Sequence, residues 1–179
     1  MEEKPIIENK IKALELELDN VKKRIDRLEP TKQDNRSKQL EDWENDNITC
    51  KSAGLKIALN DYYEVGEDGD KKTEFTFDEV KDLNIDGWRL PTAKEWTQIY
   101  SEFGFDNNDK PDRDVFAKTL MLTEYENCYG GYWSSTASSS SFAYRLYFDS
   151  SYVSPANNNH RNNGYSVRLV KDMAYSLPE

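Results

Sequence analysis

The sequence predicts an α+β domain preceded by an N-terminal coiled-coil helix that joins several copies of the chain. Three observations predict this: an apolar heptad repeat near the N-terminus, capped helical segments in the middle of the chain, and short alternating strands after residue 129. A chain of 179 residues has room for one domain of ordinary size plus an extension. We divide it into a coiled-coil helix (1–29), a linker (30–42), a globular domain (43–172) and a tail (173–179).

The charge and the termini limit the classes of partner. The formal charge is −10 and the sequence pI is about 4.7, so phosphate backbones and anionic membranes would repel the chain. No stretch approaches the roughly 20 apolar residues that span a bilayer. The N-terminus lacks the apolar core of a signal peptide, so we expect that the protein is not secreted by that route or that a leader has been removed. Two cysteines, Cys50 and Cys128, are too few for a disulfide scaffold, and one bridge or two free buried thiols both remain open.

The N-terminal helix has the clearest periodicity. Heptad position a holds Ile11, Leu18 and Ile25, and position d holds Ile7, Leu14, Val21 and Leu28. An isolated helix of this length is marginal in water, so the apolar stripe needs a partner, either another copy or the chain's own domain. The segment from Arg24 to Glu29 resembles a trimer-favouring pattern, with Arg24 at g and Glu29 at e. We therefore expect a parallel homotrimer, with a dimer as the alternative.

The linker is predicted from its polar composition, and the first elements of the domain follow it. Leu55, Ile57 and Leu59 alternate with Lys56 and Ala58, as in a half-buried strand. Residues 64–73 are acidic and contain glycine, which predicts a loop, and Thr76 to Leu83 predicts a short helix.

A longer helix is predicted from Thr92 to Phe103. Thr92 and Glu95 form a capping box, and Gly104 can end the helix. Its predicted apolar face consists of Trp96, Ile99, Tyr100 and Phe103. A polar loop and a stretch ending near Leu122 come next, and short strands with Ser- and Asn-rich turns begin at Tyr129.

Two blocks together resemble one family. The first is Ile85-Asp86-Gly87-Trp88-Arg89-Leu90-Pro91-Thr92 followed by Glu95-Trp96, and the second is Gly131-Tyr132-Trp133-Ser134-Ser135-Thr136 closed by Val167-Arg168-Leu169-Val170. Over about residues 48–172 the chain resembles the C-type-lectin-like domain of variable proteins of diversity-generating retroelements and of related bacterial surface paralogues. The resemblance implies a compact α+β domain in which two helices pack on a small antiparallel sheet, and the last strands and loops present a binding face.

Alternation within the last strands predicts which side chains form that face. Tyr144, Leu146 and Phe148 would point inward, and so would Val153 of the next strand. The opposite set mixes aromatic and small polar residues, as antibody binding sites do. The candidate ligand-binding residues are Phe142, Arg145, Tyr147, Asp149, Tyr152, Ser154, Ala156, Asn158, His160 and Asn162. We expect Trp133, Leu146, Phe148 and Val167 to anchor this face from beneath.

Composition indicates that the face is diversified. The family's mutagenic copying acts on adenines in the template, and AAC codons altered in this way never encode Lys, Glu, Gln, Met or Trp. None of these five types occurs among the 37 residues from Ser134 to Val170. The other 142 residues contain 43 of them, a rate that would give about 11 in the segment. The alternative is that Ser- and Asn-rich loops lack these residues in any case.

Catalytic and metal-binding chemistry is not predicted. The single histidine, His160, has no nucleophile and acid placed around it, so we expect a binding role and no enzyme. The fold resembles that of formylglycine-generating oxidases, a distant alternative, but their active-site motif is absent. The acidic stretches 64–70 and 106–114 fit no calcium loop, and we predict no metal or cofactor. Trp88, Trp96 and Trp133 are expected in the core.

The predicted function is ligand recognition through the C-terminal face. We expect the ligand to be a protein or glycan on a cell surface, and several heads on one stalk would add avidity. A receptor-binding component of a phage tail, carried on the virion, is the favoured reading. A non-diversified adhesin on a bacterial cell surface is the alternative.

Overall fold

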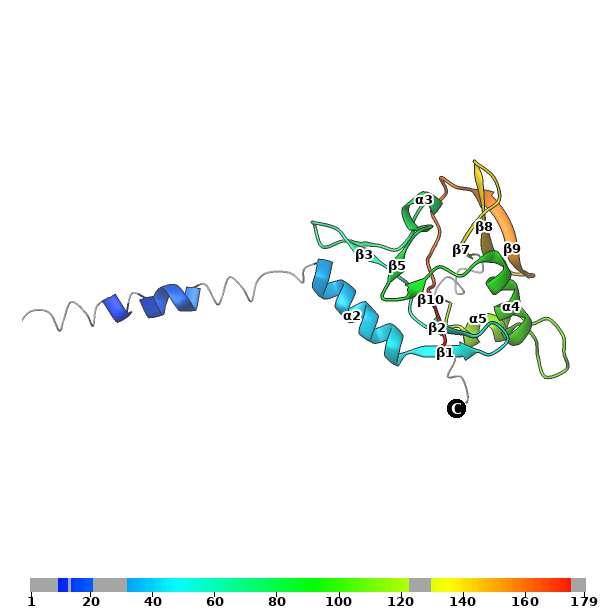
Figure 1. Cartoon of the computed structure of the whole chain (residues 1–179), viewed down its shortest axis with the longest axis horizontal. Helices are drawn as coiled ribbons and strands as arrows, with labels where there is room; N and C mark the ends of the chain where they lie inside the picture. Colours follow the sequence, from blue (N-terminus) through cyan, green and yellow to red (C-terminus); the bar gives the residue numbers. More distant parts are fainter. Residues whose placement is uncertain (1–9, 13, 21–31, 123–129, 175–179) are drawn as a thin grey trace, which may run out of the picture.

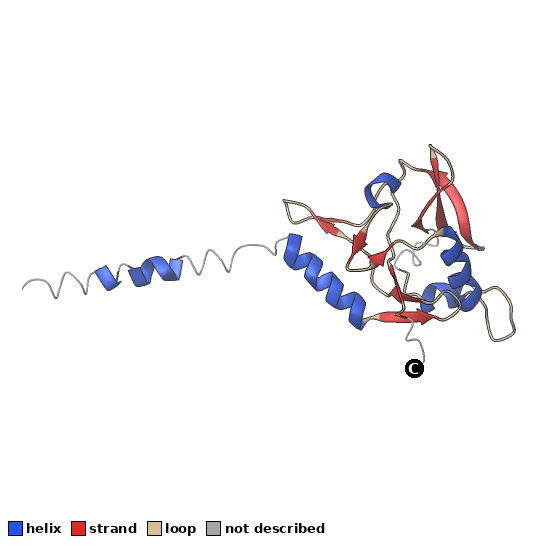
Figure 2. Ribbon diagram, in the orientation of Figure 1, coloured by secondary structure: helices blue, strands red, loops and turns tan. Residues whose placement is uncertain are grey.

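Figures 1 and 2 show the computed structural model, which describes residues 10–12, 14–20, 32–122 and 130–174. Within these residues helices pack with antiparallel sheets, which confirms the predicted α+β class. Residues 10–12 and 14–20 are helical, and the side chains of Ile11, Leu14 and Leu18 are 49%, 63% and 55% exposed. The other heptad positions (Ile7, Val21, Ile25 and Leu28), together with Arg24 and Glu29, lie outside the described residues.

A helix occupies most of the segment in which the sequence predicted a linker. Helix α2 (Lys32–Asn45) is fixed to the domain by Gln39, whose side-chain amide donates to the Tyr63 carbonyl and accepts from the Tyr63 amide, both at 3.0 Å. Trp43 is fully buried, with ring centroids of Tyr62 and Trp88 at 6.3 and 6.0 Å. The linker prediction for 30–42 was therefore wrong from Lys32 onward, because a few buried contacts are enough to hold a largely polar helix.

The larger sheet joins the two ends of the domain. Its order is β1 (Asn47–Cys50), β2 (Leu55–Ala58), β10 (Val170–Asp172), β6 (Trp88–Arg89) and β5 (Asn84–Ile85), with all neighbours antiparallel. The last strand thus lies between two earlier ones. The acidic segment predicted as a loop contains a small hairpin of β3 (Glu64–Val65) and β4 (Lys71–Lys72), turned with the help of Gly69 at φ 85°.

The helices of the domain are short and capped. They are α3 (Phe77–Val80), α4 (Ala93–Phe103) and α5 (Arg113–Thr119). The capping box predicted for α4 is confirmed: Thr92 Oγ1 accepts from the Glu95 amide at 3.1 Å, and Glu95 Oε2 accepts from the Thr92 amide at 2.7 Å. Although burial acts in the opposite direction, the two hydrogen bonds from Arg89 lower the pKa of Glu95 below its usual range.

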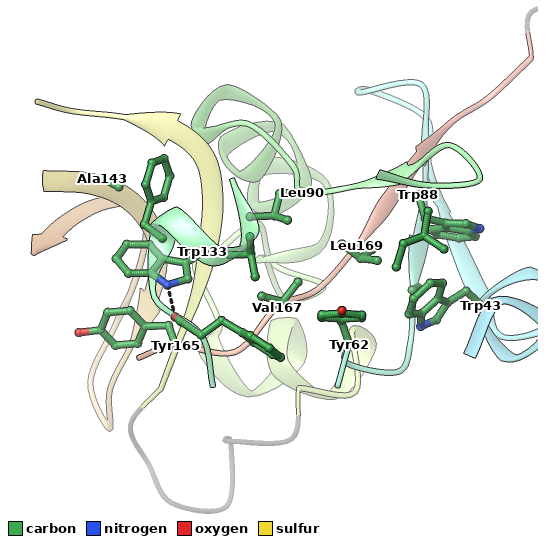
Figure 3. Packing of buried hydrophobic residues seen from close by; sticks show 14 residues of the cluster. Trp43, Tyr62, Trp88, Leu90, Trp133, Ala143, Tyr165, Val167 and Leu169 are labelled. Carbon is green, nitrogen blue, oxygen red and sulfur yellow. Dashed lines mark hydrogen bonds between the residues drawn. The ribbon is translucent and has the colours of Figure 1, made fainter. Parts of the chain in front are cut away.

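Both faces of the second sheet contribute side chains to a core. It consists of β7 (Gly130–Ala137), β8 (Phe142–Phe148) and β9 (Val153–His160), in that order. The first core lies against one face and contains Trp43, Ala58, Tyr62, Phe75, Phe77, Val80, Ile85, Trp88, Leu90, Trp133, Ala143, Tyr165, Val167 and Leu169 (Figure 3). The second core lies against the other face and contains Cys50, Leu55, Ile57, Trp96, Ile99, Phe116, Ala117, Leu120, Leu122, Tyr132, Leu146, Phe148 and Val170.

Trp133 connects these two cores. Its ring lies edge-on to Tyr165 and Phe77 in the first core, at 4.9 and 5.7 Å between centroids (Figure 3). The indole Nε1 of Trp133 donates to the Phe75 carbonyl at 2.7 Å. The backbone carbonyl of Trp133 accepts from Trp96 Nε1 at 3.3 Å. The expectation that Trp88, Trp96 and Trp133 are core residues is confirmed, since all three are fully buried.

Because α2 belongs to the domain, truncating Trp43 should destabilise the whole fold. We expect Trp43→Ala to lower the free energy of unfolding by about 3–5 kcal/mol, since it removes a buried indole. Urea denaturation followed by tryptophan fluorescence measures this. The control is Glu41→Ala on the exposed side of α2, which should change it by less than about 0.5 kcal/mol. Equal, small effects of both substitutions would show that α2 does not dock.

Candidate functional site

The predicted binding residues lie on the β8–β9 hairpin and the turn that follows it, but they are not equally exposed. Six are exposed: Phe142, Tyr152, Ala156, Asn158, His160 and Asn162. Tyr147, Asp149 and Ser154 are partly buried. Arg145 is only 4% exposed, so the prediction that its side chain points into solvent was wrong. The four residues expected beneath the face, Trp133, Leu146, Phe148 and Val167, are buried as predicted.

A bulge sets the register of the hairpin. Arg145 pairs with Asn157 and Tyr147 pairs with Ser154. Two residues of β9, Pro155 and Ala156, therefore lie opposite the single β8 residue Leu146. Proline has no amide hydrogen, and it is tolerated here because β9 is an edge strand and the bulge interrupts the ladder.

One carboxylate holds two tyrosines at the turn between β8 and β9. The Tyr147 hydroxyl donates to Asp149 Oδ2 at 3.1 Å, and Asp149 Oδ1 accepts from the amides of Ser151 and Tyr152 at 2.7 and 3.1 Å. The rings of Tyr147 and Tyr152, which we call the tyrosine pair, lie 5.7 Å apart. Tyr152 is 50% exposed. The pair therefore presents a pre-positioned aromatic surface to solvent.

The same carboxylate is ionised over a wide pH range. Hydrogen bonds from the Ser151 hydroxyl and amide lower the pKa of Asp149 to about 2. A carboxyl group whose pKa is depressed by folding stabilises the fold above its unfolded pKa of about 3.9 and loses this effect as the pH falls toward 2. The tyrosine pair is therefore held throughout the physiological pH range.

A second exposed aromatic contact lies at the other end of the hairpin. Phe142 and His160 are directly opposite each other in the ladder, and their rings meet edge-on at 5.6 Å. His160 Nδ1 also accepts from the Asn162 amide at 3.3 Å. This arrangement gives the hairpin exposed aromatic groups at both ends.

Arg145 packs against two tyrosine rings. Its guanidinium carbon is 4.2 Å from the ring centroid of Tyr165 and 4.7 Å from that of Tyr147. Among the described residues its one hydrogen bond runs from Nε to Asn157 Oδ1 at 3.3 Å, and the buried Nη1 has no partner there. A Cβ at Gly131 would lie 2.8 Å from Nη1 and 3.0 Å from the Tyr165 ring, so a larger residue there would displace the guanidinium.

Arg168 is also buried, but acceptors surround its guanidinium. Its Nε donates to Asp61 Oδ1 at 2.6 Å. The other guanidinium nitrogens donate to the backbone carbonyls of Ala58, Leu120 and Met121 at 3.0, 2.5 and 3.2 Å. This arginine, which the sequence placed in the closing block of the family resemblance, ties the last part of the chain to two loops.

The acidic loops considered as calcium sites have other roles. Asp106 Oδ1 accepts from the amides of Asn108 and Lys110, and Asp112 Oδ1 caps helix α5. Across the described part of the chain, no three His, Cys, Asp or Glu side chains gather closely enough to hold a metal ion. Cys50 is a free buried thiol that donates to Glu102 at 3.2 Å, and Cys128 lies outside the described residues.

Two clefts lie away from the hairpin. One of about 550 Å³ is lined by α2, residues 60–63, residues 71–74 and Ser166, and a smaller one of about 100 Å³ lies between α2 and residues 62–65. None of the ten predicted binding residues lines either cleft. The candidate residues also do not share one face of the sheet, because Phe142, Asn158 and His160 lie on the side of Leu146. Arg145, Tyr147 and Ser154 lie on the opposite side. None of the helices in the described ranges has the length and apolar character that a membrane crossing requires.

Comparison with known families gives one match. A family model described as a domain of unknown function (DUF8237) matches residues 103–170. The matched stretch runs from the last residue of α4 to the first residue of β10 and so contains the whole β7–β9 sheet. A comparison with curated proteins finds no match to this chain.

The two buried arginines should differ sharply in their effect on stability. We expect Arg168→Met to lower the free energy of unfolding by about 3–5 kcal/mol, because it removes the cation that pairs with the buried side of Asp61 and donates to three backbone carbonyls. Arg145→Met should cost far less, since it removes a charge that has no carboxylate partner among the described residues. Urea denaturation of both variants tests this, and equal losses would contradict it.

Proposed function

We propose that this chain is a ligand-binding protein that recognises a macromolecule, a protein or a glycan on a cell surface, through its β8–β9 hairpin. The domain would have the C-type-lectin-like fold of variable proteins of diversity-generating retroelements. The observation that carries the proposal is the tyrosine pair, which one carboxylate, Asp149, holds toward solvent.

The positions of the motif residues support the proposed fold. In the first block, Arg89 joins the start of α4 to the last strand, since it bonds Glu95 at 2.8 Å and Asp172 at 2.6 Å. In the second block, the backbone of Trp133 bonds Ser166, next to the closing segment that leads into β10. The packing of α4 and α5 in the second core and the pairing of β10 with β2 support the compact domain that the resemblance implies.

The exposure of the hairpin supports a surface that tolerates change. The exposed positions alternate along β9 at Ala156, Asn158 and His160 and continue into the turn at Asn162. Side chains at these positions can vary without entering either core, whereas the buried residues of β8 cannot. Diversification of the segment from Ser134 to Val170 remains part of this proposal.

Exposed aromatic anchors should dominate binding. We expect Tyr152→Ala to reduce capture of the intact protein by bacterial cells and glycan arrays at least tenfold, a typical loss for a central aromatic contact. The melting temperature should be unchanged because the side chain is half exposed. The control is Phe105→Ala, which truncates an aromatic side chain of comparable exposure outside the hairpin. Unchanged capture by Tyr152→Ala would exclude this face as the site.

The N-terminal stripe supports assembly of several heads, with a trimer favoured. A phage tail is the proposed carrier, and a bacterial cell surface is the alternative. Ile11, Leu14 and Leu18 are about half exposed or more, and a parallel coiled coil would bury them. Several weak heads on one stalk would raise the apparent affinity.

Changing the stripe should dissociate the assembly. We expect the double substitution Leu14→Asn and Leu18→Asn to give a monomer by light scattering, because it places amides at one d and one a position. Leu16 is equally exposed but falls at heptad position f, outside the apolar stripe. Leu16→Asn should therefore leave the mass of the assembly unchanged. A monomeric unmodified protein would exclude the coiled coil.

A further inference from the structure

We propose that the ligand carries an anionic oxygen group, a carboxylate or a sulfate, which binds the guanidinium of Arg145. This inference rests on the proposed function and names the chemistry of what the face recognises. It follows from three features that Arg145 has among the described residues: unused hydrogen-bond donors, a charge without an ion-pair partner, and a position against Tyr147 of the tyrosine pair.

The donors of Arg145 are mostly unused. A guanidinium has five N–H donors, and within the described residues this one makes a single bond, a long one of 3.3 Å to Asn157. Its Nη1 is buried without a partner in the same part of the chain. A buried donor without an acceptor costs free energy, so such groups are uncommon in folded proteins; the other two in the described part of the chain are Trp43 Nε1 and Arg161 Nε. Arg168 shows that this fold can satisfy a buried arginine completely.

Within the part of the chain that the structure describes, the charge of Arg145 also has no ion-pair partner. From Ser134 to Val170 the chain has three arginines and one acidic residue, Asp149, a formal charge of +2 in a chain of −10. Arg168 pairs with Asp61, and Arg161 pairs with Asp78. Within the described residues no carboxylate pairs with Arg145. The oxygens of Asp149 are already occupied by donors from Tyr147, Ser151 and Tyr152.

The position of Arg145 suits it to contact a ligand. The ring centroids of Tyr165 and Tyr147 lie 4.2 and 4.7 Å from the guanidinium carbon, and an acceptor binds a guanidinium at its edge, in the plane of the N–H groups. The neighbours on this side of the hairpin, Tyr147, Asn157 and Ser154, are partly exposed. The guanidinium is thus next to side chains that solvent reaches, and the exposed ring of Tyr152 lies 5.7 Å from that of Tyr147. A ligand resting on the tyrosine pair would place an anionic group beside Arg145.

The test is a titration of the full-length protein labelled with ¹⁵N-arginine. Its eight arginines give eight Nε–Hε signals, and Arg145→Met identifies one of them by its loss. Sodium acetate, sodium glucuronate and sodium sulfate are added at constant ionic strength against sodium chloride, with glucose as the neutral control. We expect saturable movement of the Arg145 signal with the carboxylates, with sulfate or with both, and none of the Arg168 signal.

The result also separates the two classes of group, since carboxylate and sulfate are titrated individually. Absence of movement with all three anions, or equal movement of the Arg145 and Arg168 signals, would overturn the inference. The proposed function fails separately, by retained cell and glycan capture in Tyr152→Ala. If capture depends on Tyr152 but the arginine signal does not respond, the face binds a neutral ligand.

Discussion

The domain depends on the position of Trp133 between its two cores. The side chain packs in the first core against Tyr165 and Phe77, while the backbone carbonyl receives the indole N–H of Trp96 from the second. Its amide donates to Ser166 and its indole to Phe75. One residue therefore fixes β7 relative to α4, to the segment before α3 and to the chain that leads into β10. The β8–β9 hairpin is positioned by the pairing of β8 with this strand.

The elements best predicted from the sequence are those that have local chemical signals. The α4 helix was predicted from the Thr92 and Glu95 capping pair and from its apolar spacing, and both were confirmed. Helix α2 was missed because a largely polar segment contains few inward residues, and the contacts that dock it, such as the Gln39 amide on the Tyr63 backbone, join positions 24 residues apart. Sequence patterns contain little information on such long-range polar contacts.

The candidate site was predicted only in part, because it too depends on contacts between distant parts of the chain. Alternation correctly separated Leu146 and Phe148 from Arg145 and Tyr147, but it indicates only which residues share a face of the sheet. Whether a face is covered depends on the rest of the fold, and here Tyr165 and Trp133 lie beneath Arg145. The glycine that makes room for its guanidinium, Gly131, was identified only as part of a motif. Its role depends on a strand pairing that the sequence does not reveal.

The bulge at Pro155 and Ala156 has a consequence for a protein that would hold several heads side by side. β9 is the outer strand of its sheet, and a straight outer strand offers a row of free amides and carbonyls to any neighbour. Here the proline removes one of those amides, and the extra residue bends the row out of line. In identical domains held close together on a common stem, the β9 strands would thus be kept from pairing with one another. The surfaces of the domains would stay available to a target.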